Sequence, residues 1–390
     1  MRALAIAILA VRFLAAQPIY DLLLKNGHVI DVKNQRDGRM DVAVSGTKIA
    51  RVAENIQASQ AKAVIDLGRY FVTPGMIDLQ AHVNFYPEIG RGVQPDLNSL
   101  RNGVTTVVDA GSAGVTTFED FKRAVIDRSQ VRVLAFLNTH ATKGKEGVEP
   151  EAVAQLVRQF SNWVVGVEAD LTGEATIADF DRVIRTAELS KTIAVFSPRS
   201  SKPVSGELLA RMRPGDILTH IYGPDRKDLS AGLLQARRRG VLFDLGHGSQ
   251  GFSFQTAASA IKQGFLPDTI SSDMDAPSLL LQRAEMATTL SKLLNLGIKL
   301  EMLVERATVN PARAIRRPEL GSLSEGSAAD IAVFAREKGK FGFLDSLNLK
   351  LAGGERLRCA LTVRNGRLVW DEDGLSLADW TTVGPYTLFK

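Results

Sequence analysis

The stretch Val104–Asn138, VTTVVDAGSAGVTTFEDFKRAVIDRSQVRVLAFLN, contains one full repeat of the pattern that decides the fold. An apolar run, Val104–Asp109, is followed by an amphipathic segment, Thr117–Arg128, and then by a second apolar run, Val131–Asn138. Short apolar runs are typical of buried strands, and an amphipathic segment of this length is typical of a helix that covers them. The stretch is therefore predicted to fold as strand, helix and strand.

The same alternation continues on both sides of this stretch. We predict buried strands at Gly75–Val83, Val104–Asp109, Val131–Asn138, Val164–Ala169, Ile193–Ser197, Ile217–His220, Val241–Asp244 and Thr269–Asp273. Further amphipathic segments between them, predicted as helices, are Pro150–Asn162, Ala178–Ser190, Leu229–Arg239 and Phe254–Lys262. Eight strands separated by helices over roughly 240 residues match the count and size of a (β/α)8 barrel. An open doubly wound sheet is the main alternative, but no Gly-x-Gly-x-x-Gly follows the first strand to indicate a dinucleotide site.

Both ends of the chain carry short β-like stretches. They are Tyr20–Lys25, His28–Val32, Met40–Ser45 and Lys48–Val52 near the start, and Ala329–Phe334, Cys359–Val363 and Arg367–Trp370 near the end. The dipeptides Asn26-Gly27 and Asn365-Gly366 are typical of tight turns in an antiparallel sheet. We therefore predict an α/β protein, with a (β/α)8 TIM barrel over residues 73–315. A small β-sandwich-like domain is predicted from both termini, residues 17–72 and 316–380.

Residues 1–16 are interpreted as a secretory signal peptide. Arg2 supplies a charged start, Ala3–Ala10 supplies a short apolar stretch, and small residues precede Gln17. An amphipathic first helix is the alternative, because Arg12 interrupts the apolar run. The signal predicts a secreted or periplasmic protein, and a cytoplasmic protein is the alternative.

The composition excludes several classes of protein. Hydrophobic residues make up 45% and charged residues 23% of the chain, which excludes a collagen, a coiled coil and a disordered chain. The net charge is +5, but basic and acidic residues are interspersed, so nucleic acid is not a predicted partner. No apolar run reaches the ~20 residues of a membrane-spanning helix, and the single cysteine, Cys359, cannot form an internal disulfide. A small-molecule substrate is the expected partner, and a homo-oligomer is left open.

Polar residues gather at the ends of the predicted strands, where a barrel exposes its active site. These residues are Asp78, Gln80, His82, Asp109, Asn138, Thr139, His140, Glu168, Ser197, Thr219, His220, Asp244 and Asp273. A single polar residue at the end of a strand is usually a hydrogen-bonded loop residue, and it is the presence of many such residues together that indicates a site. Loop hydrogen bonds explain Asp109 and Asp244 adequately, whereas an unpaired Glu168 on an apolar strand would be costly.

Several segments resemble the amidohydrolase superfamily. Thr73–Asp78 resembles the start of its barrel, and Thr308–Ala312 resembles its last helix. Gly321–Asp330 resembles the return into its small β domain. The amidohydrolase/deacetylase branch, which is related to dihydroorotases and N-acetyl amino acid deacetylases, is matched by Gly103–Gly114, Asp244–Gly248 and Gly264–Asp273. The resemblance extends from about Tyr20 to Trp370. It implies an enzyme that uses one or two divalent metal ions to activate water and polarise an amide or ester carbonyl.

The resemblance also exposes changes at the family's metal-ligand positions. The first-strand His-x-His reads Gln80-Ala81-His82, so an amide replaces one imidazole. Glu168 stands where the family has a carboxylated lysine that bridges two ions, and its shorter side chain makes bridging difficult. The fifth-strand histidine position falls on Phe196 or Ser197, neither of which supplies an imidazole.

Other ligand positions are retained. His220 and Asp273 match the family, although Asp275 stands where the motif usually continues to a histidine. The resemblance therefore implies four metal ligands, His82, Glu168, His220 and Asp273. This set is adequate for one divalent ion, with zinc expected, rather than for two. Asp273 is also the predicted catalytic general base.

The predicted substrate contacts are Gln80, His247 and Gly248. Glycines flank His247, which indicates a tight turn or a close approach of the backbone to a ligand, and an ordinary loop histidine is the alternative. The chain is thus predicted to be a metal-dependent amidohydrolase or deacetylase that hydrolyses a small N-acyl amide or ester bond. The lost ligands favour the alternative of a metal-deficient, non-catalytic homologue that binds a ligand. A dihydroorotase-like ring hydrolase is less favoured, because no basic cluster is placed to hold a carboxylated pyrimidine.

Overall fold

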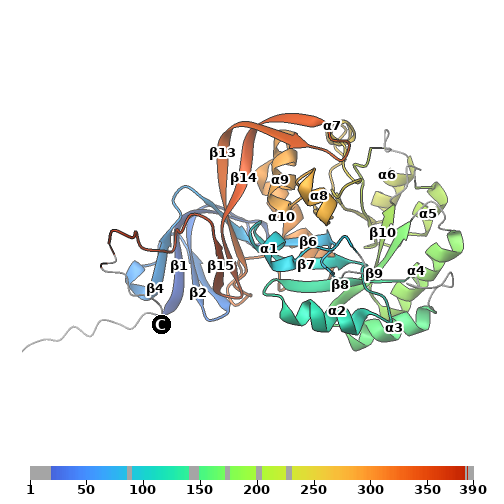
Figure 1. Cartoon of the computed structure of the whole chain (residues 1–390), viewed down its shortest axis with the longest axis horizontal. Helices are drawn as coiled ribbons and strands as arrows, with labels where there is room; N and C mark the ends of the chain where they lie inside the picture. The colour runs from blue at the N-terminus through green and yellow to red at the C-terminus, as the bar shows by residue number, and fades with distance from the viewer. Residues whose placement is uncertain are drawn as a thin grey trace, which may run out of the picture.

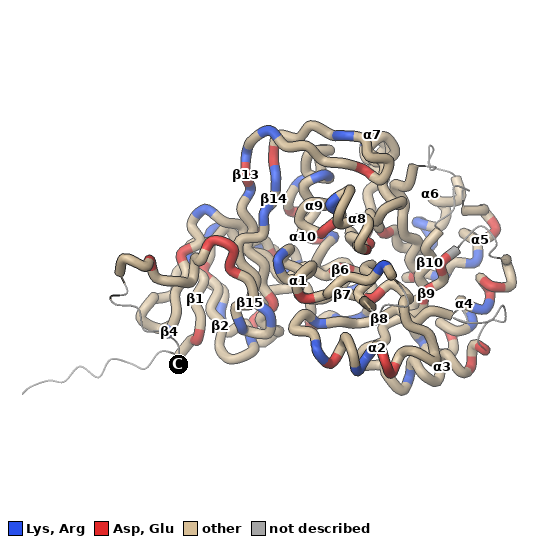
Figure 2. Tube along the Cα trace, in the orientation of Figure 1, with Lys and Arg blue, Asp and Glu red and all other residues tan. Residues whose placement is uncertain are grey.

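The computed structural model describes residues 19–85, 90–139, 149–171, 176–198, 204–224, 231–382 and 384. The predicted signal peptide, residues 1–16, and His140 lie outside them. Strands of the described part form one parallel and one mixed sheet, which lie beside each other along the long axis of the molecule (Figure 1). Basic and acidic residues are interspersed along the chain trace (Figure 2). No helix in the described ranges is long and apolar enough to cross a membrane.

The parallel sheet contains the strands predicted from the apolar runs. In spatial order from one edge, they are β6 (Met76–Ala81), β7 (Val104–Ala110), β8 (Arg132–Asn138), β9 (Val164–Leu171), β10 (Ile193–Pro198), β11 (Ile217–Leu218) and β12 (Leu242–Phe243). Strand order follows chain order, as expected when each strand is followed by a helical crossover. Seven of the predicted strands are therefore confirmed.

Helices separate these strands and continue after them. Their bounds are α1 (Pro95–Leu100), α2 (Phe118–Ala124), α3 (Pro150–Gln159), α4 (Ile177–Ser190), α5 (Gly206–Arg211), α6 (Ala231–Arg238), α7 (Phe254–Lys262), α8 (Ala276–Leu280), α9 (Met286–Asn295), α10 (Leu300–Ala307) and α11 (Val309–Ala314). Alternate residues of the strands face two apolar clusters. Phe196 on β10 stacks on Phe180 of α4 with ring centroids 4.0 Å apart, whereas its neighbour Val195 packs in the other cluster.

The segment predicted as the eighth strand, Thr269–Asp273, forms isolated parallel bridges instead of a regular strand. Thr269 bridges Asp244, which follows β12, and Met274 bridges Ala81 at the end of β6. The backbone N–H of Asp273 also donates to the carbonyl of Gln80 at 2.7 Å. The extended run ends at Asp273, which has a left-handed backbone with φ of 45°. The segment nevertheless joins the two edge strands of the parallel sheet.

Two buried carboxyl groups fasten this segment to both of its neighbours. Asp78 on β6 accepts hydrogen bonds from the backbone N–H and the hydroxyl of Ser272, at 2.9 and 2.5 Å. Asp244 accepts from the hydroxyls of Thr269 at 2.7 Å, Thr219 at 2.8 Å, and Ser271. Burial raises the pKa of Asp78 to about 7 and the pKa of Asp244 to about 6. The hydroxyls around each carboxyl offset this effect only in part.

The mixed sheet combines strands from both ends of the chain. Its spatial order is β15 (Arg367–Asp371), β14 (Lys350–Arg364), β13 (Ile331–Leu344), β5 (Phe71–Pro74), β1 (Tyr20–Asp31), β2 (Arg36–Ser45) and β3 (Lys48–Ala53), and β4 (Ala61–Asp66) also pairs with β1. The predicted antiparallel pairing holds for most of the sheet, but β4 and β5 run parallel to β1, so the sheet is mixed. Asn26-Gly27 is a bulge inside β1 rather than a turn, whereas Asn365-Gly366 does connect the antiparallel pair β14 and β15.

The β13–β14 hairpin is longer than predicted and extends away from the mixed sheet toward α7 (Figure 1). At its tip, the backbone N–H of Ser346 donates to the carbonyl of Phe252 at 2.9 Å. The carboxylate of Asp345 accepts from the backbone N–H of Phe254 at 3.2 Å. The C-terminal part of the chain therefore contacts the loop that follows β12.

The buried Asp78 carboxyl makes stability depend on pH. Its pKa of about 7 in the folded protein lies above the ordinary value of 3.8, so between these pH values the folded chain binds more protons than the unfolded chain. This group therefore lowers the free energy of unfolding as pH rises from about 4 to about 7. Asp78→Asn keeps the side-chain shape and removes the titration. Urea unfolding across this range should show a flatter pH dependence for the variant, and equal slopes for both proteins would contradict the assignment.

Candidate active site

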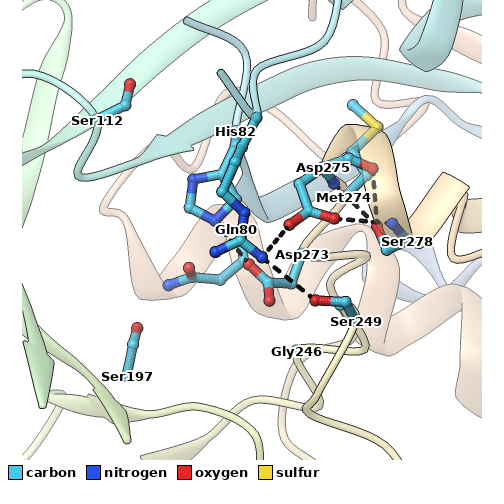
Figure 3. A network of polar contacts seen from close by, with 12 residues as sticks. Gln80, His82, Ser112, Ser197, Gly246, Ser249, Asp273, Met274, Asp275 and Ser278 are labelled. Carbon is cyan, nitrogen blue, oxygen red and sulfur yellow. Dashed lines mark hydrogen bonds and ion pairs between the residues drawn. The ribbon is translucent and has the colours of Figure 1, made fainter. Parts of the chain in front are cut away.

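The predicted site residues that meet most closely are His82, His220 and Asp273. His82 follows β6, His220 follows β11, and Asp273 lies on the bridging segment between β12 and β6. The two Asp273 carboxylate oxygens lie 3.2 Å from His82 Nε2 and 3.8 Å from His220 Nε2. All three side chains are largely buried. One carboxylate is thus placed between two imidazoles at the carboxyl ends of the parallel strands. Figure 3 shows Asp273 beside one of them, His82.

The glycine-rich loop after β12 determines how His220 is oriented. His220 Nδ1 lies 2.8 Å from the carbonyl oxygen of Gly246. A carbonyl oxygen only accepts, so His220 Nδ1 carries a proton, and Nε2 is the nitrogen that faces Asp273. A Cβ added to Gly248 would lie 2.1 Å from Asp273 Oδ2, and one added to Gly251 would lie 2.2 Å from His220 Nδ1. Glycine is therefore required where this loop packs against the two site residues.

His247, predicted to contact substrate, occupies a different kind of position. Its side chain is completely buried, and its ring stacks on Phe252 with centroids 4.7 Å apart. Lys292 Nζ lies 2.7 Å from His247 Nε2, and the carbonyl oxygen of Gly248 lies 2.9 Å from Nδ1. Burial, together with the Lys292 charge, lowers the pKa of His247 well below its usual range. In this position the ring supports the loop rather than presenting a nitrogen to a substrate.

Glu168 lies on β9 and is buried. Its Oε1 accepts a hydrogen bond from the Ser197 hydroxyl on β10 at 2.5 Å. Ser197 therefore stands at the fifth-strand position as a partner of this carboxylate, while Phe196 points to the opposite face of the sheet and packs on α4. Gly111 lies directly beside Glu168, because a Cβ there would be 3.4 Å from Glu168 Oε2.

Gln80 lies beside His82 and Asp273 (Figure 3). The residue is 1% exposed, and among the described residues its Nε2 has no hydrogen-bond partner. A buried amide N–H without a partner costs about 1–3 kcal/mol. The Gln80 amide is thus a donor available to a molecule that enters the site.

Sequence reasoning missed two cations near this site. Arg91 pairs with the buried carboxylate of Asp275 at 2.8 Å and contacts the Ser249 hydroxyl at 3.4 Å. Asp275 also caps α8 by accepting from the backbone N–H of Ser278. Lys292 lies on α9 among leucines, and this lone charge in an apolar helix segment is the signal that could have identified it.

Whether a metal ion suits these residues depends on both donor chemistry and placement. Two imidazoles and one carboxylate, as in His82, His220 and Asp273, are a frequent three-ligand set of catalytic zinc. Among the described residues, however, no group of three or more His, Cys, Asp or Glu side chains is arranged so that it could hold an ion. The donor chemistry fits one ion, but the four predicted ligands are not already arranged around a common point.

Comparisons with known proteins show which proteins this chain resembles. The model of the family described as Amidohydrolase family matches residues 253–369. A deacetylase of Agrobacterium fabrum is 29% identical over 325 residues, which cover 77% of this chain and 80% of the relative. Two solved structures, titled as an adenine deaminase and a dihydroorotase, each align with a TM-score of 0.80 and 26% identity. They cover 90% of this chain and 100% and 99% of their own chains.

The matching family model, the relative and the two structures point to proteins that act on carbon–nitrogen bonds. They agree with the motifs quoted from the sequence and with the parallel sheet found in the structure. These findings confirm that the chain resembles the amidohydrolase superfamily in sequence and in fold.

Proposed function

We propose that this chain is a metal-dependent deacetylase-type amidohydrolase that hydrolyses a small N-acyl amide or ester bond with water. The observation that carries the proposal is the Asp273 carboxylate between His82 Nε2 and His220 Nε2. The bridges of Thr269 and Met274 to the two sheet edges support the further proposal that the parallel strands form a (β/α)8 barrel. In such a barrel this end of the strands is where active sites occur.

Asp273 is the proposed general base. A carboxylate can take a proton from an attacking water and return it to the leaving nitrogen or oxygen. The bridging segment fixes this carboxylate, because Asp273 N–H is bonded to Gln80 and the preceding Ser272 is bonded to Asp78. The Gly248 backbone packs against the other side of the carboxylate. Backbone contacts and the short aspartate side chain thus fix the position of the Asp273 carboxylate.

The proposed metal site contains one divalent ion, with zinc expected. His82, His220 and Asp273 would hold it, and Glu168, which now accepts from Ser197, is the fourth proposed ligand. When bound, such an ion polarises the scissile carbonyl and lowers the pKa of water. The His220 tautomer is already the required one, because its Nδ1–H is directed to Gly246.

The proposed substrate is a small N-acyl compound. The similarity to a protein named deacetylase supports this class, and the deaminase and dihydroorotase structures also concern carbon–nitrogen bonds. The buried Gln80 amide supplies a donor for a substrate oxygen. Residues 1–16 support the further proposal that the enzyme acts outside the cytoplasm.

A metal-deficient ligand-binding protein is the second candidate function. One observation favours it: within the described residues no three-ligand group is arranged for an ion. Metal content and turnover separate the two candidates.

Asp273→Asn should abolish most of the activity, because the amide keeps the shape of the side chain and loses its basicity. We expect a panel of N-acetyl amino acids and acetate esters to show a loss of about 10²–10⁴-fold in kcat, as is typical for removal of a general base. Asp127→Asn, which changes a surface carboxyl that pairs with Lys122, is the matched control and should keep full activity. Activity of the Asp273 variant within threefold of the parent would eliminate the proton-transfer role.

Each chain should bind at most one tightly held divalent ion, because two ions need a bridging carboxylate and more imidazoles than this site supplies. His220→Ala should release the ion, whereas His28→Ala should retain it, since His28 pairs with Asp37 on the mixed sheet. Elemental analysis of protein purified without chelators measures both. Two equivalents of zinc would contradict the single-ion site, and none after zinc supplementation would favour the ligand-binding alternative.

A further inference from the structure

The side chain of Lys292 is completely buried, which is rare for lysine. Its ammonium group donates to His247 Nε2 at 2.7 Å and to the carbonyl oxygen of Gln282 at 2.8 Å. Burial lowers the pKa of Lys292 to about 7, while the carboxylates of Glu285 and Asp345 act in the opposite direction. A buried cation is costly, so this position requires acceptors in fixed places.

The two contacts of the His247 ring determine its tautomer. In its ammonium form Lys292 has only donors, so His247 Nε2 accepts and carries no proton. The ring proton is then on Nδ1, which donates to the carbonyl oxygen of Gly248 at 2.9 Å. The Lys292 contact thereby connects helix α9 to the backbone of the glycine-rich loop.

That loop contacts two of the proposed reacting residues directly. The carbonyl of Gly246, next to His247, accepts from His220 Nδ1 at 2.8 Å. On the other side, Gly248 is so close to Asp273 that an added Cβ would overlap the carboxylate. The loop is also bonded to the bridging segment, since His247 N–H donates to Ser271 and Gly248 N–H donates to Ser272, at 3.3 and 2.9 Å. A shift of the His247 ring would move these contacts.

We propose that Lys292 is a positioning residue, which acts through His247 to hold the loop Gly246–Gly251 against His220 and Asp273. Its role in turnover rests on the proposed hydrolase function. The hydrogen bonds of Lys292 go to His247 and Gln282. Its effect on His220 and Asp273 therefore passes through the ring of His247 and the backbone of its two glycine neighbours. The resulting effect is on the rate of the chemical step more than on substrate binding.

Nitrogen-15 NMR of the histidine rings tests the positioning role without substrate or metal. The full chain, labelled and free of added metal, should show the proton on Nδ1 of both His247 and His220. Lys292→Met removes the donor while keeping an unbranched side chain, and it should transfer the His247 proton toward Nε2 and broaden the His220 Nδ1–H signal. Ser291→Ala is the matched control on the same helix. It removes a hydroxyl that binds Leu357 N–H and leaves both histidine signals unchanged.

Kinetics on the acyl panel give the second measurement. Lys292→Met should lower kcat by about 10–100-fold, as expected for a misplaced site, with KM changed much less, and Ser291→Ala should match the parent. Lys292→Gln, which keeps an amide donor, should restore part of the rate and covers the case in which the Met variant does not fold. A proton on His247 Nε2 in the parent would overturn the proposal. The proposal would also be overturned if Lys292→Met, which lacks the donor, gave the same histidine signals as the parent. If the NMR results hold and no acyl substrate is hydrolysed, the proposed function fails and the positioning role stands.

Discussion

The position of the short segment Thr269–Met274 is the constraint on which the site depends. This segment joins the two edges of a parallel sheet through isolated bridges, so regular strand pairing does not hold it. Side-chain acceptors replace the missing ladder, with Asp78 bonded to Ser272 on one side and Asp244 bonded to Thr269 and Ser271 on the other. Both carboxyls are buried, and burial raises the pKa of each because it disfavours the charged carboxylate. In return, Asp273 is held in a left-handed conformation that directs its carboxylate between two imidazoles.

Support for the site comes from parts of the chain that are distant in sequence. The β13–β14 hairpin contacts the backbone near Phe252, and α9 places Lys292 on His247. Both contacts stabilise the same glycine-rich loop, which in turn packs on His220 and Asp273. Precision at a catalytic site generally requires such support, because a ligand or base that is misplaced by about 1 Å loses much of its effect. The Gln80 amide is the exception, because its Nε2 has no hydrogen-bond partner among the described residues.

Much of this architecture could be predicted from the sequence, because buried parallel strands are continuous apolar runs. Seven such runs became strands within a few residues of their predicted ends. The eighth did not: it pairs only through isolated bridges and ends at Asp273, which leaves the extended conformation. Apolar content does not report a backbone dihedral angle. Asn26-Gly27 was predicted to be a turn but is a bulge inside β1. The same dipeptide occurs in hairpin turns and in bulges, and the pairing of distant strands decides which of the two forms. At the candidate site, motifs predicted His82, His220 and Asp273, which the structure brings together. They could not identify Lys292, because its significance lies in a contact with a residue 45 positions away.

The most direct test of the central claim, that His82, His220 and Asp273 form one hydrolytic centre, is a crystal structure of the zinc-supplemented full chain with anomalous data at the zinc edge. The account predicts one anomalous peak per chain, within about 2.0–2.2 Å of His82 Nε2, of His220 Nε2 and of an Asp273 carboxylate oxygen. A peak elsewhere, two peaks at this site, or no peak with the His82–Asp273 contact intact would contradict it.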